Sequence, residues 1–521
     1  MFIILKPKSM LNKLKCTAIL SILSVAAFAQ QPILIDVDVK QNVDTFFVKL
    51  TVPEKLSKKQ NIFQFPATAP GTYQTMNIGR LVSNFEAYDK NGKLLKSELK
   101  APNQYIIAKP QKVKSLHYKV AETFDTNLKE LPIYMMAGSS IERDNVLVNA
   151  HTLSGYFKGM QNHPVGIKIH GKEGWKTGTA LKEKDGYFMA DDFDHLVDSP
   201  IMSGKLSFAE TKIADTPVRI YTFSENGKVN SEMLLKEMTQ MLKAAEKFLV
   251  KLPVDNYTFL FYFLQNPSGV TGAWEHSYSS EYVIAEEEPT PAFLKSVVDI
   301  ASHEFFHVIT PLNIHSEIIE SFNFEKPTPS QHLWLYEGVT EWASHVQLFR
   351  GGVTTLEEYI TNGLKQKIIV SENYFKPDWS LKKIAEESFN GGDGAQQYGN
   401  IYYKGALTAS YLDIRILELS NGKFGLREVL LNLIKKYGKG NPFNEKTFFD
   451  DLAAITFPEI KDFTSKYIVN NEPFPHEEYL SKIGLSYKRI GKQRVEINKI
   501  ENPTEAQKKL FEAWSVNMKV D

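Results

Sequence analysis

Two histidines and a glutamate stand close together in "ASHEFFHVITPL", residues 301–312 of this 521-residue chain. His303 and His307 are four positions apart, so on a helix their imidazoles project from one face, one turn apart. One nitrogen of each ring can then reach a single zinc ion at about 2.0–2.1 Å. Glu304 is rotated by about 100° from His303, which suits a general base acting on a water beside the metal.

The same residues also fit a structural histidine pair, so the metal interpretation needs a third protein ligand and one open position. The segment "SQHLWLYEGVTEWASHVQLFRGG", with a helix predicted over 331–349, places Glu337 after an aromatic, apolar turn. A carboxylate in such surroundings is costly unless it is paired, and a metal is a natural partner. Glu341, one turn later, is interpreted either as an acceptor for the free ring N–H of a ligand histidine or as a solvated charge.

The spacing of these motifs resembles the glycyl aminopeptidase family of zinc peptidases, gluzincins related to aminopeptidase N and thermolysin. "HEFFH" is followed after 29 intervening residues by the glutamate of "LWLYEG", and the resemblance extends over roughly residues 30–475. It implies one zinc ion per chain on His303, His307 and Glu337, with Glu304 as the base.

A second segment, "GVTGAWEHSYSS" (269–280), is similar to the segment of this family that recognises a free N-terminus. The resemblance implies that Glu275 binds the substrate α-amine and that Gly272 and Ala273 lie against the substrate backbone, glycine allowing close approach to an edge strand. Trp274 could restrict the pocket. A surface charge on a hairpin is the alternative for Glu275.

A third segment, "YGNIYYKGALTASYLDIRI" (398–416), resembles the helix that presents a tyrosine to the reacting carbonyl. By register, Tyr402 is the expected hydrogen-bond donor to the developing oxyanion, with Tyr403 as the second candidate. A core tyrosine is the alternative at either position.

The elements that must position these residues fall into two domains, and the expected fold class is multidomain α+β. Residues 30–220 are short β-branched or alternating runs, which predicts an N-terminal β-sandwich or saddle. Residues 221–474 predict a thermolysin-like, mostly helical zinc peptidase domain with a buried strand at 257–264 and the zinc helix at 292–310. Residues 475–521 form a short C-terminal extension, too short for the complete PDZ domain that many relatives carry.

Residues 1–29 predict a secretory signal peptide, since a basic start precedes "CTAILSILSVAAFA" and an A-x-A end at Ala27–Ala29. The apolar run is too short to span a bilayer, and no later stretch reaches spanning length. The only cysteine, Cys16, leaves with the signal. Removing the signal also removes four lysines, so 61 basic and 61 acidic residues become a net charge of about −4. That balance gives no reason to expect nucleic acid as a partner.

These observations predict an exported zinc aminopeptidase, periplasmic or secreted, acting on peptides with a free N-terminus. The family resemblance favours Gly or Ala as the first residue. Two alternatives stay open: a secreted endopeptidase of thermolysin type, and a non-catalytic peptide-binding protein that kept the fold. A blocked N-terminus protects a peptide from the aminopeptidase and not from the endopeptidase. The sequence indicates neither the natural substrate nor the oligomeric state.

Overall fold

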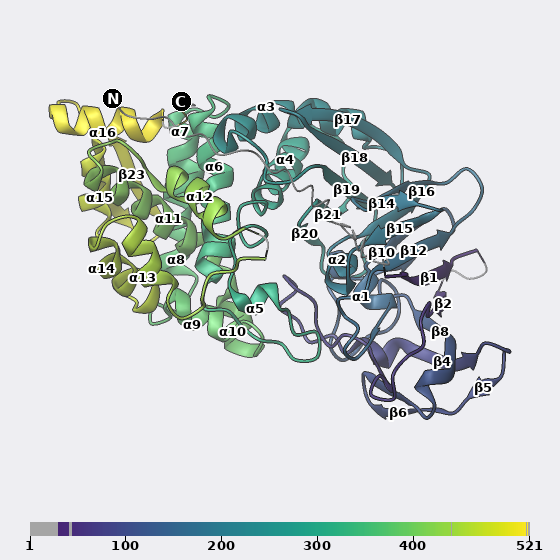
Figure 1. The fold of residues 1–521 in the computed structure, drawn as a ribbon. Coiled ribbons are helices and arrows are strands. Elements are labelled where there is room, and N and C mark those ends of the chain that lie inside the picture. The colour runs from purple at the N-terminus through teal and green to yellow at the C-terminus, as the bar shows by residue number, and fades with distance from the viewer. Residues whose placement is uncertain (1–29, 41–43, 439, 517, 519–521) are drawn as a thin grey trace, which may run out of the picture.

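The computed structural model describes residues 30–40, 44–438, 440–516 and 518. A β-rich N-terminal half is followed by a mostly helical half, which confirms the predicted α+β class (Figure 1). The predicted signal peptide, residues 1–29, lies outside the described residues. None of the described helices combines the length and the apolarity that a bilayer crossing requires.

The N-terminal domain is built from three sheets around one hydrophobic core. In its strands β1 and β2, buried and half-exposed positions alternate, as expected for a strand with one face on the core. The eight-stranded sheet has the order β14 (Lys182–Lys184), β15 (Tyr187–Ala190), β12 (Val165–His170), β1 (Ile33–Asp38), β2 (Thr45–Thr51), β8 (Val113–Ala121), β4 (Val82–Asp89), β5 (Leu94–Leu95). The two four-stranded sheets are β11 (Tyr156–Phe157), β3 (Ile62–Gln64), β7 (Gln104–Ile107), β6 (Ser97–Ala101) and β13 (Lys176–Gly178), β16 (Ile201–Gly204), β10 (Asn145–Val148), β9 (Ser140–Ile141).

The catalytic domain begins with a five-stranded sheet, in the order β17 (Ser207–Ile213), β18 (Thr216–Ser224), β19 (Tyr257–Leu264), β21 (Ser279–Ala285), β20 (Gly272–His276). The predicted strand at 257–264 is β19, parallel to both neighbours and buried along nearly its whole length, as central parallel strands are. The domain boundary predicted at residue 220 falls inside β18, so this sheet starts earlier in the chain than the hydrophobic pattern indicated. β20 is an edge strand, antiparallel to β21.

The predicted zinc helix is α4 (Pro291–Phe306), which packs its apolar face on the sheet through the Tyr257 and Phe305 rings, 4.9 Å apart. The Thr290 side chain accepts the N–H of Phe293, and Pro291 occupies the first turn, as predicted. The helix ends at Phe306 rather than at residue 310. Pro311 cannot continue a helix, and the α-helical pattern already ends before it, since the His307 N–H is directed to the Glu304 carbonyl three residues back.

Most of the remaining helices gather on the left of Figure 1, away from the strands of the N-terminal domain. The predicted helix at 331–349 is a π-helical turn, η4 (Trp334–Val339), continued by α6 (Thr340–Arg350). Single π-helical turns inside helices are frequent at functional sites. The other main helices are α3 (Ser231–Leu249), α8 (Gln366–Asn373), α9 (Leu381–Glu386), α10 (Gly392–Tyr398), α11 (Asn400–Leu419), α12 (Leu426–Lys436), α13 (Phe448–Ile455) and α14 (Glu459–Thr464).

The C-terminal extension forms α15 (His476–Lys482), the hairpin β22 (Leu485–Gly491) and β23 (Arg494–Lys499), and α16 (Glu505–Ser515). Its apolar side chains belong to the catalytic core, and Trp514 is buried there. The Arg350 side chain donates to the Trp514 carbonyl and pairs with Asp413 in the same buried region. The extension therefore completes the catalytic domain.

Candidate active site

The residues predicted to do chemistry come from four elements of the catalytic domain and from the turn that follows one of them. They are His303 and Glu304 on α4, His307 in the turn that follows, Glu337 on η4, Tyr402 on α11 and Glu275 on β20. The structure brings these side chains together, although more than a hundred residues separate the first from the last.

The three predicted zinc ligands form one buried cluster. Ligand atoms of His303, His307 and Glu337 all lie within 4.8 Å of one another. Each Nε2 atom of the two histidines is 3.5 Å from the same Glu337 oxygen. Two ligands about 2.0–2.1 Å from a tetrahedral zinc ion are about 3.4 Å apart, so this donor set has the size that zinc requires.

The other ring nitrogen of each histidine has a fixed partner. His303 Nδ1 is 2.7 Å from a Glu341 oxygen, and His307 Nδ1 is 3.0 Å from the Thr310 carbonyl oxygen. Both acceptors select the tautomer with hydrogen on Nδ1, which leaves the Nε2 lone pairs directed at the cluster. The interpretation of Glu341 as the acceptor for a ligand histidine is confirmed.

The Glu341 carboxylate is held in turn by a lysine and a histidine. Lys367 on α8 contacts the oxygen that does not bind His303, and His345 lies 3.2 Å from the same oxygen. Burial alone would raise the pKa of Glu341, but Lys367 and His303 outweigh it and lower that pKa well below its usual value. Glu341 is therefore a permanent acceptor behind the cluster. Sequence patterns had not indicated Lys367.

Glu304 stands beside the cluster without joining it. Its nearer oxygen is 3.9 Å from His307 Nε2, and the side chain is buried. Burial raises the pKa of Glu304 to about 7, with the neighbouring carboxylates of Glu337 and Glu341 adding to the rise. A carboxylate with that environment is suited to exchanging a proton with a reacting group near neutral pH.

The two tyrosine candidates on α11 face different surroundings. The Tyr402 ring is 5.5 Å from the His303 ring, and its hydroxyl is one of the groups that lower the pKa of Glu337 against the effect of burial. Tyr403 packs beside Phe375 and lies under the Lys367 ammonium. Only Tyr402 has the position that an oxyanion donor at this cluster needs. Its pKa is raised by burial, then by Glu337, so its O–H stays protonated.

A contact between two glycines places Tyr402. A Cβ atom on Gly338 would lie 2.5 Å from the Gly405 Cα, and one on Gly405 would lie 2.7 Å from the Gly338 Cα. Since no side chain fits there, α11 and η4 touch backbone to backbone. That approach brings the turn containing Tyr402 against the turn containing Glu337.

Glu275 on β20 lies near the predicted base and one predicted metal ligand. Ligand atoms of Glu275, Glu304 and His307 also lie within 4.8 Å of one another. Burial, and then the charges of Glu337 and Glu304, raise the pKa of Glu275 well above its usual value. The repulsion among three carboxyl groups this close contributes to the raised pKa values, and a bound cation would relieve it.

The alternate side chains of β20 face the N-terminal domain. Trp274 is buried in that domain's core, with its ring 5.4 Å from His151, so it does not restrict the pocket. A Cβ on Gly272 would lie 2.9 Å from the Met136 methyl carbon, so the missing side chain makes room for this domain contact. Ala273 packs beside the catalytic core.

Two aromatic residues at the site had no motif to indicate them. Tyr398, at the end of α10, has its ring 5.9 Å from that of Tyr402. Tyr73 comes from the N-terminal domain, with its ring 5.3 Å from that of Tyr398. In the sequence, Tyr73 belongs to "APGTY", a segment with the composition of a turn. The positive φ angle of Tyr73 is visible in the structure alone.

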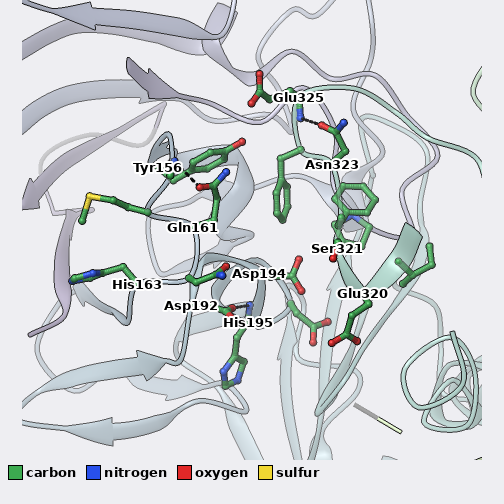
Figure 2. A pocket seen from close by; sticks show the side chains of 18 of the residues that line it. Tyr156, Gln161, His163, Asp192, Asp194, His195, Glu320, Ser321, Asn323 and Glu325 are labelled. Atoms are coloured by element: carbon green, nitrogen blue, oxygen red, sulfur yellow. Dashed lines mark hydrogen bonds between the residues drawn. The ribbon is translucent and has the colours of Figure 1, made fainter. Parts of the chain in front are cut away.

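A cavity of about 1150 Å³ lies next to the site, between the N-terminal domain and residues 311–325. Figure 2 shows Tyr156, Gln161 and His163 on one wall, with Glu320 and Glu325 on the other. None of the predicted metal, base or amine-binding residues lines it. It is therefore a separate feature of the domain boundary.

Comparison with known families places both domains. The Peptidase M61 N-terminal domain matches residues 34–205, and the M61 glycyl aminopeptidase domain matches residues 296–409, together more than half of the chain. The chain belongs to the M61 glycyl aminopeptidase family. It is thus a peptidase of the zinc metallo-aminopeptidase class, and the domain match contains His303, His307, Glu337 and Tyr402.

Solved structures with the same fold agree with this family. An aminopeptidase N family protein from Idiomarina loihiensis aligns with a TM-score of 0.75 at 19% identity, covering 88% of this chain and 79% of that one. An M1 zinc metallopeptidase from Deinococcus radiodurans aligns with a TM-score of 0.51 at 12% identity, covering 86% and 95%. A mutant of the latter, bound to a Tyr-Ser-Ala substrate, gives 0.52 at 11% identity over the same shares. No curated protein matches the chain in sequence.

Proposed function

We propose that this protein is an exported aminopeptidase that uses one zinc ion per chain to remove a small N-terminal residue from peptides. The observation that carries the proposal is the position of Glu275, whose carboxylate lies within 4.8 Å of the base Glu304 and the ligand His307. An ammonium group held there places the first peptide bond, and no later bond, beside Glu304.

The donor set of His303, His307 and Glu337 suits zinc, which supplies Lewis-acid chemistry and lowers the pKa of a water molecule toward about 7. Glu304 accepts a proton from the attacking water and passes it to the leaving amine. The Tyr402 O–H donates to the oxygen of the scissile carbonyl as negative charge develops there. Glu275 binds the substrate ammonium.

Peptides are the proposed substrates, with Gly or Ala first. The family supports this class of substrate, and the crystallised M1 neighbour with Tyr-Ser-Ala bound shows the same fold accommodating a short peptide. In the endopeptidase alternative, the substrate peptide would continue past Glu275 on its N-terminal side. The carboxylate that crowds this end of the site argues against it.

A kinetic panel of aminoacyl-arylamides tests the proposal. Free Gly- and Ala-arylamides should be hydrolysed, their N-acetyl derivatives should resist, and a chelator should abolish activity until zinc is restored. Equal cleavage of free and acetylated substrates would establish the endopeptidase instead. Absence of hydrolysis by zinc-loaded protein would leave a peptide-binding role.

Export rests on the signal peptide predicted over residues 1–29. Mass spectrometry of protein isolated from outside the cytoplasmic membrane should find a mature N-terminus at Gln30. An intact residue 1 in protein retained in the cytoplasm would contradict export while leaving the peptidase chemistry untouched.

A further inference from the structure

A loop of the N-terminal domain, residues 69–74, contacts Glu275, the predicted amine-binding residue, at what we call the amine end of the site. Gly71 has φ +73°, and a Cβ atom there would lie 2.6 Å from a Glu275 carboxylate oxygen and 2.6 Å from the Trp274 indole nitrogen. The bare backbone of this loop therefore lies in contact with the predicted amine-binding carboxylate. An L side chain at position 71 is excluded both by the φ angle and by the space.

Tyr73, two residues further on, adopts φ +47°, which is unusual for a bulky residue. Its ring lies 5.5 Å from Phe389 in the loop after α9 and 5.3 Å from Tyr398. A row of rings then continues through Tyr402 to His303. Tyr73 therefore lies between the loop backbone that contacts Glu275 at Gly71 and the tyrosines beside the metal cluster.

The loop is held by hydrogen bonds on both sides of Tyr73. The Thr72 hydroxyl donates to the Ala69 carbonyl at 2.8 Å. The Gln74 amide donates to the Pro132 carbonyl at 3.1 Å and accepts the Tyr134 N–H at 3.2 Å. A strained backbone persists where its surroundings determine it in this way, and such strain concentrates at functional sites. Tyr73 is thus a fixed wall.

The side chain of the first substrate residue must occupy the space beside this wall. Its Cβ is only two bonds from the ammonium nitrogen, which Glu275 holds, and the scissile carbonyl must reach Glu304. The residue is therefore confined between Glu275 and the metal cluster. The loop of Tyr73 borders this region at Gly71, and the row of rings from Tyr73 borders it on the side of the cluster. Hydrogen or a methyl group needs little room there, whereas a leucyl or phenylalanyl side chain meets the phenol.

We propose that Tyr73 of the N-terminal domain, backed by Phe389, is the residue that limits the size of the first substrate residue. This inference rests on the proposed aminopeptidase function and assigns its specificity to a residue outside the catalytic domain. Truncating the wall should enlarge the pocket without touching the metal ligands, Glu304 or Glu275.

The test compares wild type, Tyr73→Ala and Tyr73→Phe on Gly-, Ala-, Leu- and Phe-arylamides. A pocket wall discriminates by about 10–200-fold per added methylene. The alanine variant should therefore raise the Leu/Ala ratio of kcat/KM at least about tenfold, while the phenylalanine variant, which keeps the ring, should hold that ratio within about threefold. Tyr88→Ala, a half-buried tyrosine of β4 in the same domain, is the matched control and should change nothing.

An unchanged Leu/Ala ratio in Tyr73→Ala, with Ala-arylamide still cleaved, overturns the inference and leaves the proposed function standing. Failure of wild type to cleave any free-amine substrate removes both together. Phe389→Ala provides a second variant on the catalytic side. If Tyr73→Ala loses its circular dichroism signature, an increase of the same ratio in Phe389→Ala supports the wall, and no increase rejects it.

Discussion

The metal end of the site and its amine end differ in where their parts come from. The zinc-type donors come from two neighbouring helices of the catalytic domain and the turn after one of them: His303 on α4, His307 just past its end, and Glu337 on η4. Their supporting residue Glu341 lies one turn beyond Glu337. The amine end combines Glu275 on an edge strand with a loop from the start of the N-terminal domain. The residues proposed for bond cleavage thus belong to one domain, whereas the residues proposed to limit the size of the first substrate residue come from two.

This difference separates what substitutions should do. At the metal end they should change the rate of bond breaking for every substrate, or the affinity for zinc. At the amine end they should change which substrates react.

The largest expected effect is at Glu304. Glu304→Gln removes the proton acceptor while keeping the side-chain shape, so kcat on Ala-arylamide should fall by about 10²–10⁴-fold. Zinc content, measured by atomic emission, should stay at one per chain because Glu304 is outside the donor set. Loss of zinc together with activity would place Glu304 in the metal site and contradict the assignment.

Tyr402→Phe should reduce kcat by about 10²–10³-fold, the usual effect of deleting an oxyanion donor. Tyr403→Phe is the matched control, because Tyr403 lies on the same helix but packs against Phe375. The kcat of this variant should stay within about threefold of wild type. A larger loss in Tyr403→Phe than in Tyr402→Phe would reverse the assignment.

Glu275→Gln sharpens the comparison at the amine end. Removing one charge of a buried pair costs about 2 kcal/mol or more, so kcat/KM for free Ala-arylamide should fall roughly 30-fold or more. The ratio of free to N-acetylated substrate should fall by the same factor, because the acetylated one never makes that contact. Equal losses on both substrates would assign Glu275 to general support of the site.

The smallest effect on activity is expected at Lys367, which contacts Glu341. Lys367→Met removes the cation that holds Glu341, which orients His303. Zinc affinity should fall by about 10–100-fold, measured by competition with a chelator, while kcat at saturating zinc changes little. Lys365→Met, a half-exposed lysine on the preceding turn, should leave the affinity unchanged. Equal zinc affinity in both variants would show that Glu341 needs no cation.

The helical part of the site was predictable because helix periodicity converts sequence spacing into distance. His303 and His307 are four positions apart, which already places both rings on one face, and Thr290-Pro291 marks the helix start. The aromatic run before Glu337 indicated a buried carboxylate. The end of α4 was misplaced by four residues, since hydrophobicity continues past the last helical hydrogen bond.

Other features had no local signal. "APGTY" has the composition of any turn, and nothing in it indicates a contact with β20 some 200 positions later. Trp274 sits beside Glu275 in the chain, yet the alternation of a strand sends the two side chains to different faces. The β17–β18 hairpin has the same alternating pattern as the strands of the N-terminal domain, and pairing with β19 alone assigns it to the catalytic sheet.

The sequence by itself determined the chemical inventory of this protein: two histidines at helical spacing, a buried glutamate after them, a tyrosine helix and an acidic strand segment. Tertiary structure decided that η4 and α11 meet at Gly338 and Gly405 and that Tyr402, not Tyr403, lies beside the cluster. It also decided that Tyr73 of another domain packs against Tyr398. Spacing along one helix fixes distances through the helix geometry, whereas the approach of separate elements depends on packing that is summed over the whole fold.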